Sequence, residues 1–421
     1  MTPSHRPSGE PKAAEKGLSV RTIESAEIDG WIRCMATGFL AHPADGEGEY
    51  RLGDMDLGRT WGSFDGRTVV GTLRSFPTSF TVPGPSEVPS AALTNVTVSP
   101  THRRRGLLTQ MITGDLRASA ERGEPLGILI ASEYPIYGQF GYGAAIDAAT
   151  YRVDTVTARF LRPGVGNVEL VDLATLRLEA PPVYERVRVS QPGSIERNGR
   201  WWDGTLQQVE VPGATPTKGY QAIYRAPNGE VDGYVRYTAA QEWDHMRPKG
   251  TLSINELVAT TPDAYLRLWR YCCEVDLITR VHAGDRSVHE PLVWLLRDGR
   301  SLRQMGRFDF IWVSVLDVAA ALSARRYPTE GRLVVEVVDP LGIAGGRFAL
   351  EGGPTGATCS PTDATAQLTL PVDSLGSLYM GGMSVLALAG AGRIDEHSSG
   401  ALERAEAMFR SGITPWCSTW F

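Results

Sequence analysis

Cysteine is scarce in this sequence, and the five cysteines among 421 residues are scattered along the chain. Their spacing fits neither a disulfide framework nor a metal site, so we predict no metal and a reducing, cytoplasmic location. Long apolar runs are also missing, because no stretch approaches the ~20 residues of a membrane-spanning helix. The polar N-terminus lacks the apolar core of a signal peptide, so we expect residues 1–17 to form a disordered extension and the protein to have no membrane partner.

Positive charge is not in excess either. The chain carries 42 Lys and Arg against 48 Asp and Glu, which gives a formal net charge of −6. This balance argues against a nucleic-acid partner and is compatible with a cationic small-molecule substrate. A length of 421 residues exceeds one ordinary hydrophobic core, so we expect two or three domains.

The stretch Ala91–Gly143 carries the most informative pattern in the chain. It predicts a strand over Leu93–Val98, then a basic turn, then a helix whose apolar residues recur at helical spacing from Leu108 onward. The apolar run Leu126–Ala131 predicts a second, buried strand. This order is that of a strand–helix–strand unit with a specialised turn at the helix start.

The turn itself reads Arg103-Arg104-Arg105-Gly106. The unpaired N–H groups of a first helical turn carry the positive end of the helix dipole, and a glycine there lets a bulky anion approach the backbone. The arginines add charge that favours a diphosphate. We therefore predict a phosphate-binding site at this turn, with a solvated basic turn as the alternative.

These residues carry a family resemblance. Val96–Pro100 followed by Arg103–Leu108 resembles the acetyl-CoA signature of the GNAT acyltransferase superfamily, an Arg/Gln-x-x-Gly-x-Gly/Ala loop in which Leu108 replaces the usual last small residue. The Tyr- and Gly-rich segment Ile136–Gly143 narrows the resemblance to the mycobacterial enhanced intracellular survival (Eis) acetyltransferases and their actinobacterial relatives. The similarity extends more loosely over nearly the whole chain to Phe421.

The resemblance implies acetyl-CoA as co-substrate. The end of the first strand would pair with the pantetheine arm, and the N–H of Val98 would donate to the thioester carbonyl as negative charge develops. The basic turn would hold the diphosphate, and the residues after the second strand would line the cofactor slot. The predicted cofactor-binding residues are Val96, Thr97, Val98, Arg104, Arg105, Gly106, Leu107, Leu108, Thr109, Ser132 and Glu133.

Two residues are predicted to be catalytic. Tyr137 matches the family's catalytic tyrosine and would act as general acid, because a phenol stays protonated at neutral pH; Tyr134 and Tyr142 are competitors that we interpret as structural. For the general base, the resemblance implies the α-carboxylate of Phe421. The tail before it has no charged side chain and should be buried. Glu133, or an acidic-loop residue acting through water, is the rival base.

Acidic residues gather in the stretch Ala41–Leu57. In the superfamily this region overhangs the acceptor side of the cleft, so one interpretation is a pocket that attracts polyamines. The alternative, which we prefer, is a solvated loop, and none of these residues is a predicted site residue: Asp45, Glu47, Glu49, Asp54 and Asp56.

The middle of the chain repeats the strand–helix–strand order in degraded form. A strand over Thr251–Ala259 precedes a helical pattern that carries Tyr265 and Cys272, and Leu277–His282 predicts a returning strand. An acidic residue, Asp263, stands at the helix start and would repel a diphosphate. We therefore expect this middle domain to share the fold without binding the cofactor.

The last third of the chain changes composition. The pattern predicts an amphipathic helix over Ile311–Arg325, several strands, and an apolar helix over Ser374–Leu388. Farther upstream, Pro181-Pro182 is expected to introduce a short helix. The last third resembles the sterol-carrier-protein fold, in which the long helix covers a lipid tunnel; plain core packing is the alternative.

The predicted protein is α/β and α+β, with tandem GNAT acetyltransferase folds followed by a sterol-carrier-protein-like domain. We expect a catalytic domain over residues 18–150, a cofactor-less domain over 151–300, and a third over 301–421 whose tail reaches the active site. The predicted function is N-acetyl transfer from acetyl-CoA to primary amines of cationic acceptors. The resemblance implies aminoglycosides acetylated at several positions, or lysine side chains, and a hexameric homo-oligomer. The alternative is a lipid or small-molecule carrier with a vestigial acetyltransferase fold.

Overall fold

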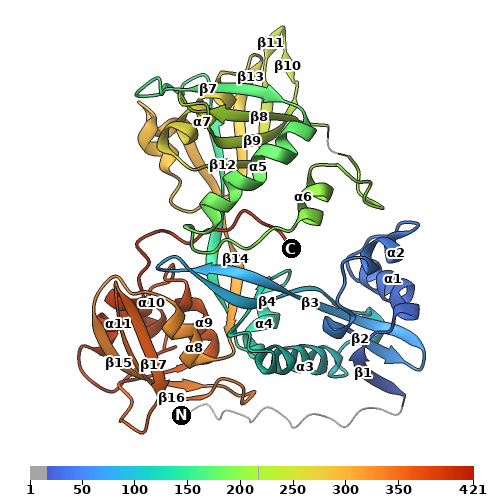
Figure 1. Ribbon diagram of the computed structural model, residues 1–421, viewed down its shortest axis with the longest axis vertical. Helices are drawn as coiled ribbons and strands as arrows, with labels where there is room; N and C mark the ends of the chain where they lie inside the picture. Colours follow the sequence, from blue (N-terminus) through green and yellow to red (C-terminus); the bar gives the residue numbers. More distant parts are fainter. Residues whose placement is uncertain (1–16, 217) are drawn as a thin grey trace. The chain divides into compact units, whose positions relative to one another are not determined.

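The computed structural model describes residues 17–216 and 218–421, so the extension predicted for residues 1–17 lies outside the described residues apart from Gly17. The chain divides into two compact units. The first holds the described residues up to Pro77 together with 91–123 and 211–213; the second holds 78–90, 124–210 and 214–421. Figure 1 colours the chain from blue at the N-terminus to red at the C-terminus.

The first unit is built on a sheet of strands that follow one another in the chain. β1 (Leu18–Thr22) pairs antiparallel with β2 (Thr60–Asp65), β2 pairs antiparallel with β3 (Thr68–Val82), and β4 (Ser86–Val98) lies beside β3. The Asp65-Gly66 pair is a typical hairpin signal, and β2 and β3 do form a hairpin there, with Asp65 paired to Thr68. β4 starts at Ser86, seven residues before the predicted strand, and ends with it at Val98.

Two helices cover opposite faces of this sheet (Figure 1). α1 (Ile28–Gly38) packs Trp31 into a core with Phe64, whereas α3 (Leu107–Glu121) sets Gly114 against the ring of Trp61. The short helix α2 (Glu47–Leu52) follows α1. Since α3 begins nine residues after β4 ends at Val98, the predicted strand, basic turn and helix are confirmed in their order.

The second unit contains a large sheet in the order β5-β14-β6-β13-β12-β9-β8-β7. Neighbours run antiparallel except for β12 and β13, which are parallel. The strands are β5 (Leu126–Ile130), β6 (Tyr142–Asp154), β7 (Asn167–Val171), β8 (Tyr220–Arg225), β9 (Val231–Ala240), β12 (Gly250–Ala259), β13 (Ile278–Ser287) and β14 (Leu302–Val315). The short hairpin β10 (Trp243–Asp244) and β11 (Arg247–Pro248) stands apart from this sheet.

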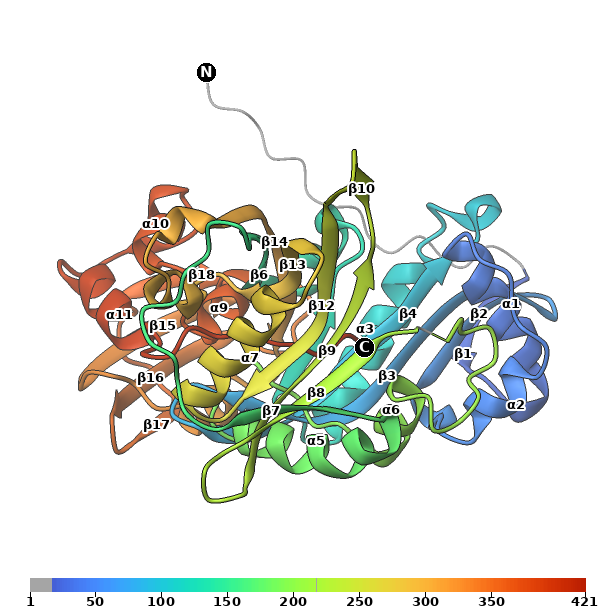
Figure 2. The same cartoon turned by 90° about the horizontal axis from the view of Figure 1, so that it is seen from above.

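Helices also cover both faces of the β8–β9–β12 part of this sheet (Figure 2). α7 (Pro262–Glu274) packs Leu268 and Trp269 into one core, and α5 (Leu173–Arg188) with α6 (Gly199–Thr205) packs Tyr184 and Trp202 into the other. Successive side chains on a strand therefore point to opposite faces: Leu257 of β12 belongs to the core with α7, and Val258 belongs to the core with α5. The strand, helix and returning strand predicted for the middle of the chain are thus confirmed.

The last part of the second unit adds a 5-stranded sheet in the order β17-β16-β15-β18-β19. Its strands are β15 (Gly331–Val338), β16 (Gly346–Gly353), β17 (Gly356–Pro361), β18 (Leu368–Pro371) and β19 (Asp395–Glu396), and its helices are α8 (Val318–Ala324), α9 (Val372–Tyr379), α10 (Val385–Gly390) and α11 (Ala401–Phe409). α9 packs on β6 and β14 of the large sheet. This packing favours the structural interpretation of the apolar helix over a lipid tunnel.

Three local predictions are wrong. The helix expected over Ile311–Arg325 exists only as α8, because residues up to Val315 form the end of β14 and pair with both β5 and β6. The helix expected over Ser374–Leu388 is two helices, since Gly381 adopts a φ of 72° between α9 and α10. Pro181-Pro182 lies inside α5, which starts instead at the side-chain cap of Asp172.

No helix in the ranges 17–216 and 218–421 is both long and apolar enough to cross a membrane.

Candidate functional site

The basic turn of the first unit adopts left-handed backbone conformations. Arg104 has a φ of 64° and Gly106, the N-cap of α3, a φ of 76°. Left-handed residues in a turn are one way in which successive N–H groups come to face one concave side and bind an anion. Arg103, Arg105 and the other residues of the turn are exposed, whereas Leu107 is buried and anchors the helix start. The turn therefore presents its backbone and its charge to solvent.

The start of α3 has no side-chain cap, because its N-cap is a glycine. In the second unit, the N-terminus of the corresponding helix, α7, is blocked to an anion in three ways. Thr261 caps it by accepting from the N–H of Ala264, Pro262 has no N–H, and Asp263 forms an ion pair with Arg162. Of these two helices, only α3 leaves the N–H groups of its first turn, and the positive end of its dipole, available to an anion.

The end of β4 is held in an irregular conformation beside α1. Asn95 has a φ of 56°, and its carbonyl accepts a hydrogen bond from the hydroxyl of Thr72 at 2.8 Å. A side chain at Gly38 would collide with Thr97, so the helix end lies against the strand. The residues from Val96 to Val98 are half-buried, and they lead directly into the turn.

The acidic loop residues are mostly engaged with basic neighbours. Glu47 pairs with Arg51 at 2.8 Å, and Asp54 lies 3.8 Å from Arg74. Asp56 caps the N–H of Gly58. Glu47 and Glu49 lie in the short helix α2 and not in a loop, but the pairing with basic neighbours favours a solvated surface over a polyamine pocket.

Tyr137 ends the four-residue helix α4 (Tyr134–Tyr137) of the second unit and is 4% exposed. Burial raises the pKa of its phenol, a hydrogen bond with the Ser132 side chain lowers it, Glu133 raises it again, and the net shift is upward from 10.0. The structure thus brings Ser132 and Tyr137 together. Tyr134, by contrast, is 64% exposed and meets the ring of Trp312 edge-on.

The glycines that follow Tyr137 make room for α9. A Cβ at Gly143 would collide with the Asp373 carbonyl oxygen, and one at Gly141, whose φ is 81°, would lie 3.0 Å from Val372. Tyr142 packs edge-on against Tyr137. The Tyr- and Gly-rich segment is therefore braced by the last third of the chain, a contact that sequence reasoning missed.

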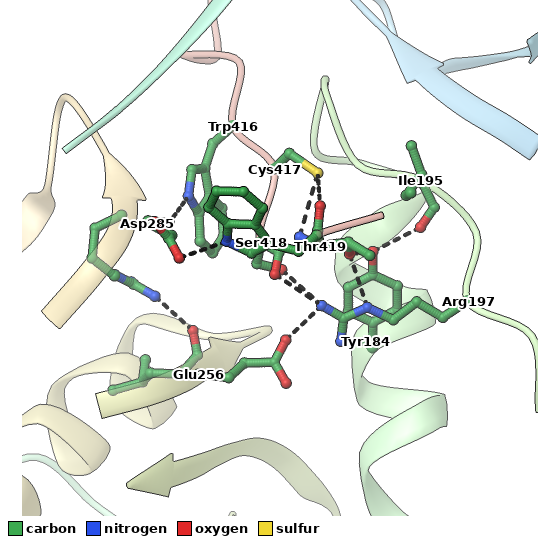
Figure 3. Close-up of polar contacts among 12 residues, drawn as sticks. Tyr184, Ile195, Arg197, Glu256, Asp285, Trp416, Cys417, Ser418 and Thr419 are labelled. Atoms are coloured by element: carbon green, nitrogen blue, oxygen red, sulfur yellow. Dashed lines mark hydrogen bonds and ion pairs between the residues drawn. The ribbon is translucent and has the colours of Figure 1, made fainter. Parts of the chain in front are cut away.

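The C-terminal tail is anchored on the second unit (Figure 3). Cys417 and Thr419 are buried, as predicted for the tail, whereas Trp420 is 55% exposed. The indole N–H groups of Trp416 and Trp420 donate to the backbone oxygen and the carboxylate of Asp285 at 2.7 and 2.8 Å. Phe421 is half-buried at the end of this anchored segment. The catalytic roles of Tyr137 and Phe421 stay predictions.

Among the described residues, no group of three or more His, Cys, Asp or Glu side chains could hold a metal ion.

Comparison with family models divides the chain into three matched segments. Residues 19–145 match a model described as an acetyltransferase (GNAT) domain, residues 193–311 match a second model of the same description, and residues 318–418 match a sterol carrier protein domain. The segments follow one another in the order predicted from the sequence.

Relatives match over most of the chain. An uncharacterized N-acetyltransferase from Streptomyces avermitilis is 42% identical over 412 residues, 96% of this chain and 99% of the relative. The N-acetyltransferase Eis of Mycobacterium tuberculosis is 37% identical over 84% of this chain and 86% of its own length. The crystal structure of Eis1 from Mycobacterium abscessus superposes with a TM-score of 0.84 at 33% identity, and it covers 96% of this chain and 100% of the Eis1 chain.

Proposed function

Because this chain belongs to the Eis-type N-acetyltransferases of the GNAT superfamily, we propose that it acetylates primary amines of cationic acceptors, namely aminoglycosides at several positions or lysine side chains. Acetyltransferases of this superfamily take acetyl-CoA as co-substrate. The formal net charge of −6 supports a cationic acceptor. The observation that carries the proposal is the exposed turn at Arg104–Gly106, which has left-handed residues at both ends and leaves the start of α3 without a side-chain cap.

The first unit supplies the proposed cofactor seat. The N–H groups of Gly106, Leu107 and Leu108 would bind the diphosphate, with Arg104, Arg105 and Thr109 around them. The strand end from Val96 to Val98 would pair with the pantetheine arm and polarise the thioester. By family resemblance, Ser132 and Glu133, which are exposed after β5, would also line the cofactor slot.

The chemistry needs one acid and one base. The amine nitrogen attacks the thioester carbon, the carbon–sulfur bond breaks, and the Tyr137 hydroxyl protonates the leaving thiolate. The Phe421 carboxylate takes the proton from the amine through water. Burial raises the pKa of Tyr137, so its phenol keeps its proton at neutral and mildly basic pH, as a general acid must.

The closed start of α7 supports the proposal that the middle domain binds no cofactor. Its first turn offers a carboxylate, at Asp263, where the first domain offers arginines. The intact turn of the first domain argues against a carrier whose acetyltransferase fold is vestigial.

A panel of amines tests the function. We expect the full-length, tag-free chain to transfer acetyl groups from acetyl-CoA to aminoglycosides and polyamines, with mass shifts of more than one acetyl group on aminoglycosides. Lysine-containing peptides in the same panel show whether lysine side chains, the second proposed acceptor class, are acetylated as well. A chain that binds CoA but acetylates none of these amines would contradict the proposal.

A matched pair of glycine variants tests the cofactor seat. Gly106 and Gly123, at the two ends of α3, have φ values of 76° and 77°, and a Cβ would fit in the open space at either. Alanine should therefore cost each ~1 kcal/mol of backbone strain. Only Gly106→Ala should also weaken CoA binding, about tenfold, or ~1.4 kcal/mol, by calorimetry. Equal CoA affinity in the two variants would show that the diphosphate does not bind at the start of α3.

We also propose that the chain forms a homo-oligomer, hexameric by family resemblance. The hairpin β10–β11 supports this, because it exposes Trp243 and Met246 at 52% and 88%; light scattering on the full chain would give the mass.

The five cysteines are all free and buried, which supports our proposal of a reducing, cytoplasmic compartment.

A further inference from the structure

The parallel strands β12 and β13 separate at their carboxyl ends. They pair only as far as Ile254 and Ala283; beyond this point β12 pairs with β9 alone and β13 with β6 alone. Register on β12 also shifts between Ile254 and Glu256, which marks a bulge that re-aims the Glu256 side chain. Crevices at the carboxyl ends of parallel strands are where α/β sheets bind ligands. A pocket does lie at these strand ends, and its lining includes Leu257 of β12, Arg286 of β13 and Trp416 of the tail; we call it the β12–β13 cleft.

The chain's own tail lies across this cleft. On the β13 side, Asp285 holds Trp416 and Trp420 through their indole N–H groups, and the guanidinium of Arg286 lies 4.9 Å from the Trp416 ring centre. Gly193 is at a φ of 102°, and a Cβ there would lie 2.8 Å from the Trp416 carbonyl oxygen, so the neighbouring loop closes directly on the tail backbone. The tail is seated by contacts along its length.

On the β12 side, the anchor is Arg197. Its side chain is 1% exposed and pairs with Glu256 at 2.7 Å (Figure 3). Its guanidinium carbon lies 3.8 and 4.0 Å from the ring centres of Tyr184 and Trp201. The Arg197 Nε–H donates to the Thr419 hydroxyl at 2.9 Å. The ion pair with Glu256 and the two ring faces compensate the buried charge, so these contacts hold the guanidinium in place.

The Thr419 hydroxyl completes a directed chain of hydrogen bonds. Tyr184 donates its proton to the Ile195 carbonyl at 2.7 Å, so at 3.0 Å it accepts from Thr419, which in turn accepts from Arg197. The neighbouring Ser418 also accepts from Arg197, through its backbone oxygen at 3.3 Å and its hydroxyl at 3.2 Å. This network fixes the backbone two residues before the terminal carboxylate.

We infer that the β12–β13 cleft of the middle domain serves as the seat of the C-terminal tail, and that Arg197 and Thr419 are positioning residues for the Phe421 carboxylate. The inference rests on the proposed role of that carboxylate as general base. It gives the middle domain a task in the reaction: to hold the base of the first domain's chemistry in place.

Thr419→Val tests the seat with little change in shape. We expect kcat to fall about tenfold, because small misplacements of a catalytic group are costly, with KM for acetyl-CoA unchanged. Carboxypeptidase should release Phe421 several times faster, as followed by intact mass. Thr419→Ser keeps the hydroxyl and should restore both values, and Thr358→Val, at an exposed threonine of β17, should behave as wild type.

A double variant, Arg197→Met with Glu256→Gln, removes both buried charges together and should show the same two effects. Unchanged Phe421 release in both the Thr419→Val and the double variant would overturn the seat, and faster release with unchanged kcat would overturn the positioning role. Phe421 release does not depend on turnover. A wild-type chain that acetylates no amine would therefore count against the proposed function alone.

Discussion

Replacement of Tyr137 by phenylalanine should lower kcat about a hundredfold or more, because proton transfer by a positioned acid contributes on this scale. The ring stays in place in a pocket where only 4% of the residue is exposed, so only the hydroxyl and its hydrogen bond with Ser132 are lost. CoA affinity should change little. Steady-state kinetics with acetyl-CoA and an aminoglycoside, beside calorimetry with CoA, measures the two effects separately.

Tyr134→Phe is the matched control, since Tyr134 lies three residues away on the same helix and is 64% exposed. Its kcat should stay near that of wild type. The pH dependence gives a second check, because burial raises the pKa of Tyr137 above its ordinary value near 10. The acid form then persists as pH rises, so wild-type kcat should not decline between about pH 7 and 9. A Tyr137→Phe variant with wild-type kcat would remove the acid assignment.

The first unit was well predicted because its signals are local. The β-branched strand, the Arg-rich turn and the glycine at the start of α3 lie within a short stretch. Each of these signals predicts a local backbone structure without reference to distant residues. In the structure Gly106 has a φ of 76°, a conformation that glycine adopts without strain. The Asp65-Gly66 hairpin is equally local.

Errors arose where the deciding partner lies far away in the chain. Ile311–Val315 is an apolar run that periodicity cannot assign, and its pairing with β5 and β6 makes it a strand. The glycines at 141 and 143 were interpreted with Tyr137, yet their space is taken by α9 from the last third of the chain.

Arg197 had no signal in the sequence at all. It is a single arginine in a loop, and its partners Glu256 and Thr419 come from a strand bulge and from the tail. A buried ion pair between distant segments follows from the assembled fold, not from a motif. The same holds for Asp285, which binds two tryptophans of the tail from the end of β13.

Deletion of Phe421 should lower kcat about a hundredfold, because the new terminal carboxylate would sit ~3.5 Å back along the chain, out of range of the amine proton. Stability should hardly change. The side chains that anchor the tail, Trp416 and Thr419, remain, and Phe421 itself is only half-buried. Thermal unfolding and kinetics on the tag-free chain measure both quantities.

A Gly-Ser extension after Phe421 is the sharper variant, because it keeps the phenylalanine ring and converts its carboxylate into a peptide bond. Both variants should lose turnover while they bind CoA as wild type does. If both kept wild-type kcat, the base would lie elsewhere, and Glu133→Gln should then abolish turnover, since Glu133 is the exposed carboxylate four residues before Tyr137. If Glu133→Gln is active while both terminal variants are impaired, the C-terminal carboxylate is the base that takes the proton of the amine.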